Sequence, residues 1–154
     1  MSHAPIRVGL FLLGVGPSPS GVWTRLRDMV GALSGETELE LYAAVTSESE
    51  RDLLALPPER TLLLPPIGLI QRVVHTSRAA RAFVSRFDLD VLQVESMPIP
   101  QRASVPMVVS LHDLREFDSP AWKIRSAAEV YRRTMMPRHA RRVDAIFSLT
   151  LWMK

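Results

Sequence analysis

The stretch VGLFLLGVGPSPSGVWTRL, residues 8 to 26, decides how this chain folds. Its first six residues are an apolar run of strand length, and apolar positions after Gly21 recur at helical spacing. Between them lie glycines, prolines and serines, which are typical of a strand-to-helix turn. Glycine lets a backbone approach a ligand closely, and free N–H groups at a helix start attract anions. The stretch therefore predicts either a phosphate-binding turn or a plain turn in which Ser20 caps the helix.

Two well-known phosphate-binding patterns do not match this turn. The dinucleotide pattern G-x-G-x-x-G fails because Gly14 and Gly16 are followed by the next glycine only at Gly21. The Walker pattern fails because Val22 and Trp23 stand where its lysine and hydroxyl residue should be. Without that lysine no point charge faces the terminal phosphates, so we do not expect a P-loop NTPase.

Further apolar runs of strand length follow along the chain, at residues 39–45, 61–64, 91–94, 107–111 and 145–149. Most are nearly continuous, which is typical of strands buried on both faces of a parallel sheet. Helical spacing links them over residues 22–33 and 70–87, and a third helix is expected within residues 122–142, kinked or divided at Pro137. The pattern predicts an α/β fold: one Rossmann-like domain over residues 1–154, with an open, mainly parallel sheet and helices on both faces.

The composition excludes several classes of protein. The chain has no cysteine, which rules out a disulfide scaffold, a thiol nucleophile and a cysteine zinc site. The apolar run at residues 8–15 is too short to span a bilayer and lacks the features of a signal peptide. We therefore expect a cytoplasmic protein.

Positive charge gathers toward the C-terminal end, where residues 115–154 hold nine Lys and Arg against four Asp and Glu. Within it, the segment YRRTMMPRHARRVD, residues 131–144, combines arginines with an apolar stripe. This helix could lie on an anionic membrane, as a peripheral contact at the inner face, or pack its stripe on the sheet with the arginines in water. Nucleic acid is not expected, because aromatic residues are few and no recognition motif is present.

Polar residues follow two of the predicted strands at the edge where ligands bind to open α/β sheets. Glu95 and Ser96 come after the fourth strand and could accept hydrogen bonds from substrate hydroxyls, with a solvated carboxylate as the alternative. His112 and Asp113 come after the fifth strand, where the histidine could bind a sugar hydroxyl or a phosphate and the aspartate could orient it. A structural His-Asp turn is the alternative. No set of histidines suited to a metal site accompanies them, so we expect no metal.

Taken together, five segments resemble the N-terminal half of a family four, GT-B type glycosyltransferase. They are IRVGLFL (6–12), SGVWTRLRDMVGAL (20–33), FDLDVLQVES (87–96), VPMVVSLHDL (105–114) and YRRTMMPRHARRVDAIFSLTLWMK (131–154), which match in order and spacing. In that family two Rossmann-like domains face each other across a cleft. The N-terminal domain mainly binds the acceptor, and the C-terminal domain binds a nucleotide-sugar donor.

The resemblance implies a retaining, nucleotide-sugar-dependent transfer to a saccharide or lipid-linked acceptor, without a metal or any cofactor besides the donor. It implies that Gly21 places backbone N–H groups near the donor diphosphate, and we expect Gly16 and Ser20 of the same turn to bind substrate as well. His112 would contact the transferred sugar and assist the reaction. The chain departs from the family in having Ser20 in place of the first residue of a Gly-Gly pair, and Glu95 in place of a histidine.

The sequence stops at Lys154, where a helix would follow the sixth strand. We therefore expect a truncated acceptor-side domain without its donor domain, inactive as residues 1–154 alone. Two alternatives stay open. One is a non-catalytic chain or binding module that keeps the fold, and the other is a GT-B-like sugar-nucleotide epimerase.

Overall fold

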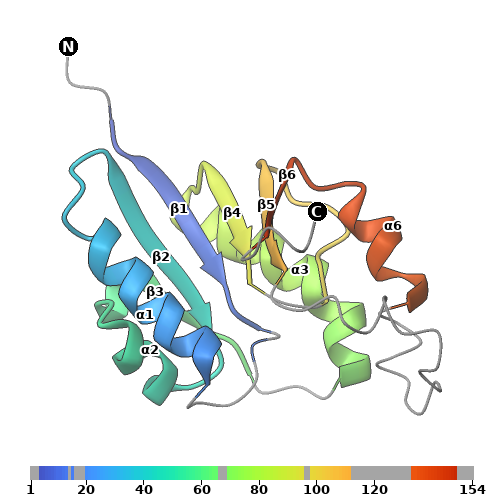
Figure 1. The fold of residues 1–154 in the computed structure, drawn as a ribbon, viewed down its shortest axis with the longest axis horizontal. Helices are drawn as coiled ribbons and strands as arrows, with labels where there is room; N and C mark the ends of the chain where they lie inside the picture. Colours follow the sequence, from blue (N-terminus) through green and yellow to red (C-terminus); the bar gives the residue numbers. More distant parts are fainter. Residues whose placement is uncertain are drawn as a thin grey trace.

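A six-stranded sheet forms the centre of the molecule (Figure 1). The computed structural model describes residues 4–13, 15, 20–65, 69–95, 98–111 and 133–148. The strands are β1 (Ile6–Phe11), β2 (Leu39–Val45), β3 (Thr61–Leu63), β4 (Val91–Val94), β5 (Met107–Leu111) and β6 (Ala145–Ser148). Each coincides with one of the six apolar runs, which confirms the predicted strands.

The strands lie in the order β3-β2-β1-β4-β5-β6, and every neighbouring pair is parallel. The chain therefore moves outward from β1 to one edge of the sheet and then returns to add β4 on the other side of β1. This order and the flanking helices give a Rossmann-like α/β fold, as predicted.

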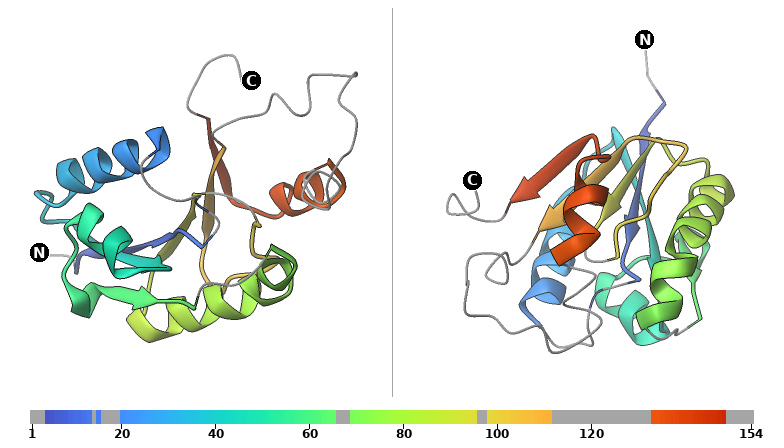
Figure 2. Two further views of the ribbon diagram at one scale, coloured as in Figure 1. Left: turned by 90° about the horizontal axis from the view of Figure 1, so that it is seen from below. Right: turned by 90° about the vertical axis from the view of Figure 1, so that its right-hand side faces the viewer.

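Helices cover both faces of the sheet (Figure 2). The helices α1 (Gly21–Leu33) and α2 (Glu48–Leu54) pack on one face, and α3 (Leu69–Phe87) packs on the other. The short helix α6 (Met136–Ala140) lies on the α3 side, where Ala140 contacts the core. A 3-10 turn, η1 (Pro58–Arg60), leads into β3.

Successive side chains along β1 and the residues after it point to opposite faces of the sheet, so the core is divided into two clusters. Leu10 and Leu12 pack with α1 and α2, whereas Phe11 and Leu13 pack with α3. All four side chains are at most 2% exposed. The apolar run at the start of the chain is therefore buried on both faces, as a central parallel strand requires.

Gly9 allows α3 to approach β1 closely. A Cβ atom built there would lie 2.8 Å from Cε1 of Phe83 and would also overlap the side chain of Leu89. Both of these side chains belong to the core between α3 and the sheet. The absence of a side chain at Gly9 is thus part of how this face packs.

The helices agree with the sequence in most places. The structure confirms helices over 22–33 and 70–87, but α2 was not predicted. Residues 133 and 134 are helical, the chain turns at Met135, and α6 then begins, so the helix is divided just before Pro137, as predicted. The rest of the third predicted helix lies outside the described residues.

None of the helices in the described part of the chain is long and apolar enough to cross a membrane. Within the same residues, no group of three or more histidine, cysteine or acidic side chains could hold a metal ion.

Candidate functional site

The sequence places its candidate residues at one edge of the sheet, after β1, β4 and β5. Because every neighbouring pair of strands is parallel, all six strands end at this edge. Ser20 and Gly21 begin the helix after β1, and Glu95 directly follows β4. The other candidates, Gly16, Ser96, His112 and Asp113, lie outside the described residues.

Ser20 occupies the N-cap position of α1, with extended backbone angles. Its carbonyl oxygen accepts from the Thr24 N–H at 3.1 Å, but its side chain makes no capping hydrogen bond. Gly21 is exposed, and a Cβ atom there would meet nothing within 4 Å. Among the described residues, the space at Gly21 is therefore open and the Ser20 side chain leaves the first N–H groups of α1 uncapped, which is a suitable environment for an anion.

Glu95 is fully buried, so the alternative of a solvated carboxylate is wrong. Arg25 of α1 and Gln93 of β4 both donate to its carboxylate. The Ser110 hydroxyl of β5 donates to Oε1 at 3.0 Å, and Gln93 Nε2 donates to that hydroxyl oxygen at 3.3 Å. We call Arg25, Gln93, Glu95 and Ser110 the Glu95 cluster. It joins α1 to the ends of β4 and β5 on the face opposite α3.

Arg25 places a positive charge beside the buried carboxylate of Glu95. Its side chain is 23% exposed, its Nη1 lies 3.8 Å from the Met29 sulfur, and its buried Nε has no hydrogen-bond partner among the described residues. Arg25 thus spans from the buried carboxylate to the surface. The cluster fixes the first turns of α1 relative to β4 and β5.

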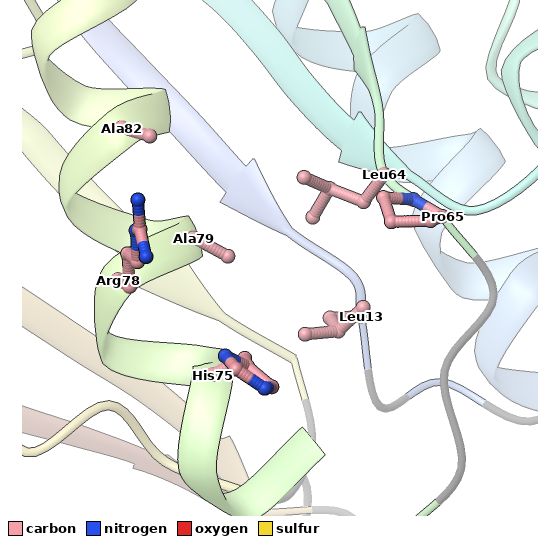
Figure 3. Close-up of a pocket in the computed structure, with 7 residues that line it drawn as sticks. All are labelled: Leu13, Leu64, Pro65, His75, Arg78, Ala79 and Ala82. Atoms are coloured by element: carbon pink, nitrogen blue, oxygen red, sulfur yellow. The ribbon is translucent and has the colours of Figure 1, made fainter. Parts of the chain in front are cut away.

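A pocket of about 420 Å³ opens at the same edge of the sheet, on its α3 face (Figure 3). Leu13 follows β1, Leu64 and Pro65 follow β3, and all three face α3. Four residues of α3 complete the described lining: His75, Arg78, Ala79 and Ala82. The lining is mostly apolar with two basic side chains, and the volume is in the usual range for small-molecule sites, about 300–1,000 Å³.

The sequence did not identify His75 and Arg78 as site residues, although it placed them on a helix. Nor did it identify Arg25, Gln93 and Ser110. Gln93 and Ser110 are polar residues inside buried apolar strands, and such residues need hydrogen-bond partners. That signal could have pointed to the Glu95 cluster.

The basic segment, residues 131–144, packs in part against the sheet. Ala140 and Val143 contact the core, while Arg138, Arg141 and Arg142 are exposed. His139 is buried, and its pKa lies below the ordinary value of 6.5 because burial disfavours the charged ring. The charge of Arg142 lowers this pKa further, whereas a hydrogen bond with the Ile99 backbone raises it. The packing alternative is thus seen for the described residues, and a contact with an anionic membrane stays a prediction.

A second hollow, of about 390 Å³, lies at the opposite, amino edge of the sheet. It is lined by residues before β5 and β6, among them Arg102 and Asp144. The Asp144 carboxylate accepts from the Met107 N–H at 2.8 Å and so ties the starts of these two strands together. Of the predicted site residues, the described ones, Ser20, Gly21 and Glu95, do not line it.

Comparison with known proteins adds little to this geometry. No protein-family model matches the chain. Over 95 residues, 60% of this chain, it is 32% identical to the ABC-type transporter claG of Penicillium crustosum. The match covers 13% of that protein's length, so the chain is similar to a small part of it. A likeness of this extent does not show which family the chain belongs to.

Proposed function

We propose that this chain is the acceptor-side domain of a retaining glycosyltransferase that uses a nucleotide-sugar donor. In this proposal the start of α1 faces the donor diphosphate, and His112 contacts the transferred sugar. The acceptor is a saccharide or a lipid-linked molecule. The donor's nucleotide would be held mainly by a second domain, facing the carboxyl edge of the sheet.

The strand order is the observation that carries this proposal. In the order β3-β2-β1-β4-β5-β6, β2 and β3 are added on one side of β1 and β4 to β6 on the other, so the direction of strand addition reverses between β1 and β4. Ligands of open α/β sheets bind outside the carboxyl ends of the strands at such a reversal. The turn before Gly21 follows β1, and Glu95 follows β4, so the predicted residues flank this point.

The chemistry of the described residues is compatible with this role. The N–H groups at the start of α1, which the Ser20 side chain leaves uncapped, suit a diphosphate, because a diphosphate carries negative charge and accepts several hydrogen bonds. Glu95, in contrast, is committed to Arg25, Gln93 and Ser110. We therefore assign Glu95 a positioning role in place of the predicted contact with acceptor hydroxyls.

Sugar transfer by the protein expressed from its complete reading frame tests the proposal. We expect a labelled sugar to pass from a nucleotide sugar to an acceptor with its anomeric configuration retained. Replacing His112 by alanine should lower kcat about 100-fold or more, because a contact made in the transition state is lost. Glu38→Ala, a change at an exposed residue before β2 at the amino edge of the sheet, is the control for general effects of a substitution.

Two results would count against the proposal. Unchanged turnover in the His112→Ala variant would remove the assigned role of that residue. Turnover of the donor without any acceptor would favour an epimerase. Circular dichroism of the variant separates these outcomes from a loss of folding, which would instead favour a structural His-Asp turn.

A further inference from the structure

The pocket on the α3 face has an apolar interior and a basic rim. Leu13 and Leu64 point toward α3, and the Ala79 methyl group points back toward them (Figure 3). The His75 ring is directed from α3 toward Leu13, while the Arg78 side chain runs along the helix (Figure 3). A ligand here would meet hydrocarbon on two sides and cationic or hydrogen-bonding groups on α3.

The positive charge of Arg78 is not used within the described part of the chain. Arg78 is exposed and forms no ion pair with any described carboxylate. The whole of α3, residues 69–87, contains four arginines and no acidic residue. His75 and Arg78 are three residues apart, so they lie on the same face of the helix.

We propose that this pocket binds an amphipathic anion, with an apolar chain against Leu13, Leu64 and Ala79 and an anionic head at Arg78 and His75. A guanidinium offers paired N–H donors that match the oxygens of a phosphate or carboxylate. The assignment of this ligand as the sugar acceptor rests on the proposed function, and it selects the lipid-linked class over a free saccharide. The binding itself does not depend on sugar transfer.

The test is a calorimetric titration of the chain with octyl phosphate below its micelle concentration, with octanol and inorganic phosphate as the two half-ligands. We expect octyl phosphate to bind more tightly than either. Shortening it to hexyl phosphate should weaken binding by about fourfold for each methylene removed from the pocket.

Two variants of neighbouring arginines separate the pocket from a general basic surface. Arg78→Gln should weaken octyl phosphate binding about tenfold or more and leave octanol binding unchanged, because only the charge-assisted bonds are lost. Arg81→Gln is the matched control, since Arg81 is exposed on the same helix but does not line the pocket. Ala82→Phe, at the exposed rim, should weaken binding of both octyl phosphate and octanol by filling the pocket.

Vesicles of phosphatidylcholine with phosphatidic acid distinguish a membrane lipid from a soluble amphiphile. Weaker vesicle binding by Arg78→Gln than by Arg81→Gln identifies a bilayer lipid as a source, and the same contrast with octyl phosphate alone identifies a soluble one. Equal losses in the two variants, or no binding of octyl phosphate, would overturn the proposal. Binding with this contrast in a protein that transfers no sugar would contradict the proposed function and leave the pocket assignment standing.

Discussion

At the scale of single residues, Glu95 makes the most consequential contacts of the described site. When the carboxylate of a buried ion pair is replaced by a neutral group, the partner cation is left in the interior without an opposite charge. This costs several kcal/mol of stability when both groups are fully buried. Because Arg25 is 23% exposed, water reduces this penalty. We expect Glu95→Gln to lower the free energy of unfolding by about 2 kcal/mol in urea denaturation.

Arg27→Gln is the matched control, since Arg27 lies on the same helix and pairs with Asp28 at the surface. Exposed ion pairs contribute at most about 1 kcal/mol, so this variant should remain close to the parent chain. In a double-mutant cycle with Arg25→Met, the loss for the pair should be smaller than the sum of the two single losses. A Glu95→Gln variant as stable as Arg27→Gln would show that the buried ion pair does not form.

At the scale of elements, the contact between β1 and α3 depends on Gly9. Gly9→Ala would press a methyl group onto Phe83 and Leu89, so we expect a loss of about 1–3 kcal/mol in the free energy of unfolding. Gly31→Ala is the control: Gly31 is a helical residue of α1, and a Cβ added there would meet no atom within 4 Å apart from the backbone of its own helix and its chain neighbours. That change should stabilise the chain by about 0.5–1 kcal/mol. Thermal and urea unfolding measure both, and equal effects would contradict the close packing at Gly9.

The elements also show what the sequence can predict. The apolar runs predicted all six strands of the sheet, because a strand buried on both faces consists almost entirely of apolar residues. Helix α2 was not predicted, because it has seven residues, of which only Glu50 and Leu54 are buried, and so shows no helical pattern of apolar residues. A capping pattern was nevertheless present, since Ser47 precedes Glu50 by three residues and its hydroxyl accepts from the Glu50 N–H at 3.3 Å.

The contacts of the site could be predicted less well than its place. The parallel topology locates the carboxyl edge from the sequence alone, and Ser20, Gly21 and Glu95 all lie there. The burial of Glu95 depends on Arg25, 70 positions away along the chain, and no local pattern encodes that pairing. In the same way, the α3 pocket forms from residues of three separate elements.

At the scale of the whole molecule, the central claim is that the carboxyl edge of the sheet receives a sugar nucleotide. The most direct measurement is a titration of the ¹⁵N-labelled chain with UDP-glucose and GDP-mannose, followed by the amide signals in NMR spectra. One domain supplies few contacts to the nucleotide, so we expect weak binding, with a Kd on the order of 1 mM. The account predicts that the amide signals of Gly21 and His112 shift with either donor, while those of Arg102 and Ala103 at the amino edge stay in place. Shifts confined to the amino edge, or no shift at Gly21 and His112 with either donor, would contradict it.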